Sequence, residues 1–204
     1  MTGEQLAENW ARLSAWEMLA VGLAIAYLVL AVRQNRWCWV AAFVSTAIFT
    51  ALFWGVELLM QSALNVYYMG MAVYGWWQWG RGGRGDGELA VTRWRWQAHA
   101  GILALVVLAT LISGHLLRLH TQAAWPYLDS FITWGAVVTT FMVARKVLEN
   151  WAWWMLINAL AVFLFIERSM LLTAGLHLSY LVISVFGWIS WYRDFHGARN
   201  RAPG

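Results

Sequence analysis

Seven long apolar segments, separated by short charged breaks, limit what this chain can fold into. Each segment has about the 20 residues that an α-helix needs to cross the hydrocarbon core of a bilayer. In lipid, backbone polar groups must be hydrogen-bonded within the spanning segment, so such segments form helices. The sequence therefore predicts an all-α integral membrane protein with seven transmembrane helices, near residues 16–33, 37–54, 57–79, 97–117, 124–144, 150–166 and 169–191.

The composition agrees with a membrane protein and argues against several kinds of chemistry. Charged residues make up 12% of the chain, whereas soluble domains carry about 25%. The single cysteine, Cys38, excludes an internal disulfide and a cysteine-based metal cluster. The sequence contains no Walker motif and no grouping of His, Asp and Glu at metal-ligand spacing. We therefore expect no catalytic residue, no metal and no cofactor, which disfavours a membrane enzyme.

The basic residues gather on one side of the predicted membrane. If the N-terminus lies outside, 11 of the 14 Lys and Arg residues fall on the cytoplasmic side. The positive-inside rule then predicts a multi-pass membrane protein with its N-terminus outside and its C-terminus in the cytoplasm. The basic excess is thus a topology signal, and we expect the lipid bilayer rather than nucleic acid as a partner. The glycine-rich connection at 81–97 is predicted to be a solvated loop.

The chain resembles itself when it is shifted by 112 residues. The segment YYMGMAVYGWWQW (67–79) then lies on SYLVISVFGWISW (179–191), and Trp39 lies on Trp151. An odd linker span between two triplets leaves both in the same orientation, which is a parallel repeat of the kind that some transporters use. We predict a single membrane domain, 1–204, with a 3+1+3 order of spans: a three-helix repeat at 16–79, a linker helix at 97–117 and a second three-helix repeat at 124–191.

Polar and aromatic residues recur on one face of the sixth segment. Trp151, Trp154 and Asn158 follow helical spacing, whereas Trp153 points elsewhere. Polar groups at membrane depth usually face a cavity, which favours a binding site. The alternative is that the tryptophans belong to the interfacial belt and that Asn158 makes a hydrogen bond between helices.

Two further stripes repeat this pattern in the third and seventh segments. The first contains Gln61, Asn65 and Tyr68, and the second contains His177 and Tyr180. With the sixth segment they could line one pocket that offers aromatic faces and neutral hydrogen-bonding groups. Such a pocket suits a flat heteroaromatic ring, including a cationic one, and an amide or sugar substituent. The predicted substrate-binding residues are Trp151, Trp154, Asn158, Gln61, Asn65, Tyr68, His177 and Tyr180.

Three segments carry a family resemblance that extends over about residues 16–191. RKVLENWAWWMLINALAVFLF (145–165), PYLDSFITW (126–134) and VYGWWQW (73–79) resemble the Pnu family of vitamin transporters. The resemblance implies a SWEET-like pair of fused triple-helix bundles that assembles as a homotrimer. It also implies facilitated diffusion of an unphosphorylated vitamin across the bacterial inner membrane, after which a cytoplasmic vitamin kinase traps the vitamin by phosphorylation.

The resemblance orders the candidate substrates. Nicotinamide riboside, a precursor for NAD biosynthesis with a pyridinium, a carboxamide and a ribose, comes first, followed by thiamine and then riboflavin. Nicotinamide riboside carriers tend to have amide side chains where this chain has Ser45 and Ala72, and often a tyrosine where it has His177. A membrane receptor or assembly subunit that transports nothing is the alternative class.

Overall fold

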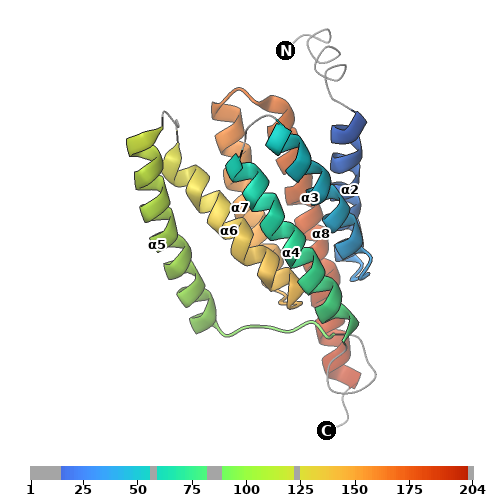
Figure 1. The fold of residues 1–204 in the computed structure, drawn as a ribbon. Coiled ribbons are helices and arrows are strands. Elements are labelled where there is room, and N and C mark those ends of the chain that lie inside the picture. Colours follow the sequence, from blue (N-terminus) through green and yellow to red (C-terminus); the bar gives the residue numbers. More distant parts are fainter. Residues whose placement is uncertain (1–14, 56–58, 82–88, 122–124, 202–204) are drawn as a thin grey trace. The chain divides into compact units, whose positions relative to one another are not determined.

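The computed structural model describes residues 15–55, 59–81, 89–121 and 125–201, and its regular structure is helical (Figure 1). Each of the seven predicted apolar segments contains a helix, so the prediction of an all-α fold is confirmed. In chain order the helices are α2 (Ala15–Val32), α3 (Cys38–Gly55), α4 (Leu59–Gly80), α5 (Trp96–His120), α6 (Pro126–Ala144), α7 (Asn150–Glu167) and α8 (Leu171–Arg201).

Six of these helices are long and apolar enough to cross a membrane, as judged over the described residues. The helix outside this set is α4, which has 22 residues but a more polar sequence. Gln61, Ser62 and Asn65 lie within it and lower its hydropathy. The structure therefore supports a multi-pass membrane protein with six apolar spans, and the seventh span stays a prediction.

The chain divides into two compact units, residues 1–77 and 78–204. In the first unit α2 packs against α3. The Trp39 indole lies on Gly75, where an added Cβ would clash with the ring. Only glycine allows so close an approach of a helix backbone to an indole.

The second unit contains α5 to α8, in which each helix packs against the next one along the chain. Trp151 of α7 lies on Gly187 of α8, where an added Cβ would meet the indole at 2.5 Å. The same indole meets Trp191 nearly at a right angle, with ring centroids 5.4 Å apart. Trp79, in the last turn of α4, donates to the backbone oxygens of Val143 and Ala144 at 3.3 and 3.2 Å, which caps the end of α6.

Helices α2 and α6 end in the same way. Gln34 and Lys146 have φ of 54° and 48°, so each occupies the left-handed region that side chains other than glycine rarely adopt. Around each residue the backbone makes the two hydrogen bonds of a Schellman motif. The four bonds are Gln34 N to Ala31 O (3.0 Å), Asn35 N to Leu30 O (2.9 Å), Lys146 N to Val143 O (3.0 Å) and Val147 N to Met142 O (3.0 Å).

Candidate functional site

Two predicted site residues meet between α7 and α8. The Oδ1 atom of Asn158 lies 2.9 Å from Nδ1 of His177, and Nδ2 of Asn158 donates to the backbone oxygen of Trp154 at 2.8 Å. Because the amide nitrogen is used on its own helix, the amide oxygen faces the histidine. An amide oxygen only accepts, so Nδ1 of His177 carries a proton, and in the neutral ring Nε2 then holds the acceptor lone pair.

Aromatic rings surround this polar pair. The ring of Phe165 stacks on His177 with centroids 5.1 Å apart and an interplanar angle of 21°. Tyr180 meets the same imidazole edge-on at 5.7 Å. The structure thus brings together three of the predicted residues, Asn158, His177 and Tyr180. Phe165 was missed, although it lies seven residues after Asn158 and therefore on the same helix face.

The two predicted tryptophans of α7 differ in their surroundings. Trp151 is 1% exposed and lies within the packing of α7 on Gly187, which gives it a structural role. Its Nε1 atom has no hydrogen-bond partner among the residues that the structure describes. Trp154 is partly buried and shares the helical turn that ends at Asn158. Substrate binding by either tryptophan stays a prediction.

The predicted residues of α4 lie in the first unit. Asn65 is 8% exposed and donates from Nδ2 to the backbone oxygen of Gln61 at 2.9 Å, as Asn158 does to Trp154. Gln61 is exposed, and Tyr68 is partly buried beside Tyr67. The hydroxyl of Ser45 donates to the backbone oxygen of Ala20 at 2.7 Å, so it is engaged within the helix packing. That α4 lines one pocket together with α7 and α8 stays a prediction.

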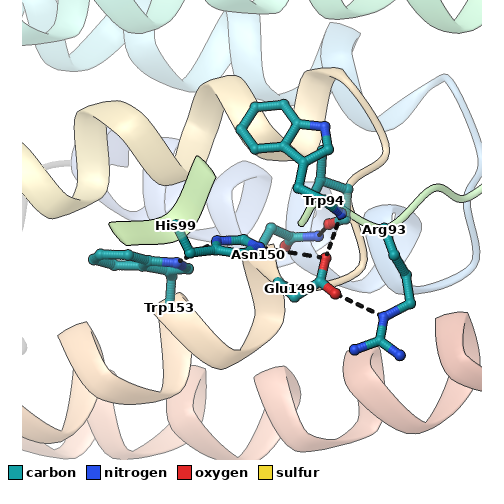
Figure 2. A network of polar contacts seen from close by, with 7 residues as sticks. Arg93, Trp94, His99, Glu149, Asn150 and Trp153 are labelled. Atoms are coloured by element: carbon teal, nitrogen blue, oxygen red, sulfur yellow. Dashed lines mark hydrogen bonds and ion pairs between the residues drawn. The ribbon is translucent and has the colours of Figure 1, made fainter. Parts of the chain in front are cut away.

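A polar network at the start of α7 was not predicted (Figure 2). Arg93 donates from Nε to Oε1 of Glu149 at 2.7 Å, and the backbone N–H of Trp94 donates to Oε2 at 3.3 Å. Trp153 donates from Nε1 to Nδ1 of His99 at 3.4 Å. Residues 89–95 lie outside the helices and are largely exposed, in line with the predicted loop, but residues 92–94 are also bonded to the corner between α6 and α7.

The α7–α8 cluster combines neutral hydrogen-bonding groups with aromatic rings. Asn158, His177, Phe165 and Tyr180 offer π faces, amide and imidazole hydrogen-bonding groups and a phenol, and none of them has a permanent charge. Over the described ranges of the chain, no three His, Cys, Asp or Glu side chains are grouped as metal ligands would be. A flat ring with polar substituents fits this set of groups.

Comparisons with known proteins agree with the fold. The family model for nicotinamide mononucleotide transporters matches residues 14–193. The chain is 25% identical to the riboflavin/roseoflavin transporter RibM of Streptomyces davaonensis, over 92% of this chain and 91% of that protein. It is 22% identical to the nicotinamide riboside transporter PnuC of Escherichia coli, over 74% of this chain and 75% of that protein.

A solved structure gives independent support for the fold. The crystal structure of the vitamin B3 transporter PnuC matches with a TM-score of 0.68, at 19% identity, over 89% of this chain and 82% of that chain. These relatives are transporters, which is consistent with the expectation that the chain is not an enzyme. Since the family model covers most of the sequence, the predicted resemblance is confirmed, and the chain belongs to the nicotinamide mononucleotide transporter (PnuC) family of vitamin transporters.

Proposed function

We propose that the chain carries an unphosphorylated vitamin with a flat aromatic ring across the bacterial inner membrane by facilitated diffusion. The hydrogen bond between Asn158 and His177, flanked by Phe165 and Tyr180, carries this proposal. Asn158 lies near the middle of α7, where an amide is costly unless it is paired or faces a polar ligand. A hydrogen bond that only joins two helices is the structural alternative.

The charge of the cluster favours an unphosphorylated substrate. A phosphate group would find no Lys or Arg among Asn158, His177, Phe165 and Tyr180 to compensate its charge, and burying an uncompensated charge is strongly unfavourable. Net uptake through such a carrier needs a sink on the inner side. Phosphorylation of the vitamin by a cytoplasmic kinase would supply one, because the charged product no longer fits the site.

Two vitamins are candidates on specific grounds, and we place riboflavin first. The relative named for riboflavin aligns over nine-tenths of both chains. The amides typical of nicotinamide riboside carriers are absent at positions 45 and 72, which counts against nicotinamide riboside. Neither residue replaces them, because Ala72 has no polar side-chain group and Ser45 uses its hydroxyl within the helix packing. Nicotinamide riboside is the second candidate because of the similarity to PnuC. Thiamine is a further alternative.

The same proposal includes the 3+1+3 parallel repeat within one membrane domain, with α4 as the seventh span. Two observations support it. Gln34 and Lys146 end their helices with matching Schellman bonds 112 residues apart, and Trp39 lies on Gly75 as Trp151 lies on Gly187. We further propose an outside N-terminus, a cytoplasmic C-terminus and a homotrimeric assembly.

Proteoliposomes that contain only this protein test the function. Labelled riboflavin, nicotinamide riboside and thiamine are added outside, each with and without an imposed proton gradient. We expect one of them to equilibrate with the lumen without a gradient and without ATP. Accumulation above the outside concentration under the gradient would argue for ion coupling, and binding without entry of any of the three would favour a receptor that transports nothing.

A further inference from the structure

Residues 89–99 form a strap that runs along the corner between α6 and α7 and then enters α5. The backbone N–H of Thr92 donates to the oxygen of Lys146 at 2.9 Å, and the N–H of Leu148 donates to the oxygen of Thr92 at 2.8 Å. These two bonds make a short parallel bridge. The strap is therefore attached by its backbone to the residues that lead into α7.

Side chains add a second attachment. The Glu149 side chain is only 13% exposed, whereas that of Arg93 is 51% exposed. A carboxylate that is largely removed from water is costly unless it is paired and hydrogen-bonded. Arg93 Nε and the Trp94 N–H supply this pairing at 2.7 and 3.3 Å. Glu149 is the residue directly before α7, so the strap holds the first turn of that helix.

A third attachment reaches one turn further into α7. The indole N–H of Trp153 only donates, so Nδ1 of His99 accepts and a neutral His99 carries its proton on Nε2. That Nε2 lies 3.8 Å from Oε2 of Glu149. Figure 2 shows the resulting row, in which His99 lies between Trp153 and Glu149, and Arg93 lies beyond Glu149.

This geometry fixes the rotation of α7 about its own axis. Trp153 is held toward α5, and Asn158 then meets His177 on α8. A rotation of α7 by about 20° would move a side-chain tip, about 5 Å from the axis, by about 2 Å, which is enough to break the bond to His177. We propose that Arg93, His99 and Glu149 are positioning residues, which set the orientation of Trp154 and Asn158 toward the substrate. The inference rests on the proposed function because it assumes a substrate, but its first test measures only the orientation of α7 and needs no substrate.

The first test needs no substrate. Asn158→Cys and His177→Cys are introduced together with Cys38→Ala, and the two thiols are joined by a short bifunctional thiol reagent. We expect Arg93→Ala and Glu149→Gln to slow this cross-link severalfold. Arg95→Ala, which removes an equal charge from an exposed position two residues along the strap, should leave the rate unchanged. Equal rates in all three variants would overturn the proposal.

The second test uses transport of the vitamin that the wild-type protein carries. Arg93→Ala and Glu149→Gln should raise KM by about threefold to tenfold with Vmax preserved, the size expected for one lost hydrogen bond. The double variant Arg93→Ala/Glu149→Gln should have a KM no higher than either single variant, because both substitutions break the same Arg93–Glu149 contact. His99→Asn keeps an acceptor near Nδ1 and should keep a wild-type KM, whereas His99→Leu should not.

The outcomes separate the two proposals. If the wild-type protein moves no vitamin, the proposed function fails, and the cross-linking rates still decide whether the strap orients α7. If the strap variants melt early and lose Vmax with an unchanged KM, the strap only supports folding and the positioning role is refuted.

Discussion

Replacement of Asn158 by leucine separates stability from binding. The substitution removes the acceptor of His177 Nδ1 and the donor to Trp154 O. A hydrogen bond between helices stabilises a membrane protein by about 0.6 kcal/mol on average. The imidazole N–H that is left without a partner adds a desolvation penalty of about 1–3 kcal/mol to this loss of stability. We therefore expect Asn158→Leu to lower stability by roughly 1–3 kcal/mol.

A second substitution should restore what the first removes. In the double variant Asn158→Leu/His177→Leu no polar group is left unsatisfied, and replacing both partners by apolar groups is often nearly neutral. The double variant should therefore be more stable than either single variant. Its binding should not recover, because the groups that recognise the ligand are gone. The loss of one substrate hydrogen bond of about 1.4 kcal/mol lowers affinity about tenfold.

Thermal melts and calorimetric titrations on detergent-purified protein measure the two quantities. Riboflavin is the first ligand, followed by nicotinamide riboside and thiamine. Leu156→Ala, at an exposed position of the same helix, is the control and should leave affinity unchanged. The reasoning is refuted if the double variant is destabilised by the sum of the single effects, or if Asn158→Leu binds all ligands as the wild-type protein does.

Three further predictions follow from single features. Gly187→Ala places a methyl group 2.5 Å from the Trp151 ring, and this overpacking should cost about 1–3 kcal/mol of stability and lower the melting temperature. Gly175→Ala is the control: its added methyl group has no neighbour within 4 Å, so the melting temperature should equal or exceed that of the wild-type protein. Trp154→Ala should weaken vitamin binding by about ten- to a hundredfold if its ring stacks on the substrate, and an unchanged titration would remove it from the site. A cysteine at Asp86 should resist an impermeant thiol reagent in intact spheroplasts, and rapid labelling there would reverse the proposed topology.

The helices and the α7–α8 cluster could be predicted because both follow from periodicity. A helix repeats its face every three or four residues, so Asn158 and, in its own segment, His177 and Tyr180 stand out as polar positions at depth. Phe165 continues the same face and could have been included. Trp151 follows this spacing too, but because Gly187 has no side chain, the Trp151 indole is buried in the packing between α7 and α8.

The strap could not be predicted because its contacts join residues more than 50 positions apart. Arg93 and Glu149 look like ordinary charges beside membrane spans, and only the backbone bridge at Thr92 brings them together. Trp153 was expected to point away from the site, and it does lie against α5. Its bond to His99 makes Trp153→Ala unsuitable as a neutral control, which periodicity alone does not reveal.

The Asn158–His177 bond has a consequence for how substrate preference can change. An asparagine at position 177 would place its amide N–H near the position of the imidazole Nδ1 and could donate to Asn158 Oδ1, so the two helices would remain joined. The amide, however, has no nitrogen at the position of Nε2, whereas the neutral imidazole keeps a lone pair there once Nδ1 donates to Asn158. An exchange between His and Asn at this position therefore preserves the bond between α7 and α8 while removing an acceptor for ligand protons. A carrier built in this way could acquire a new cargo without first losing its fold.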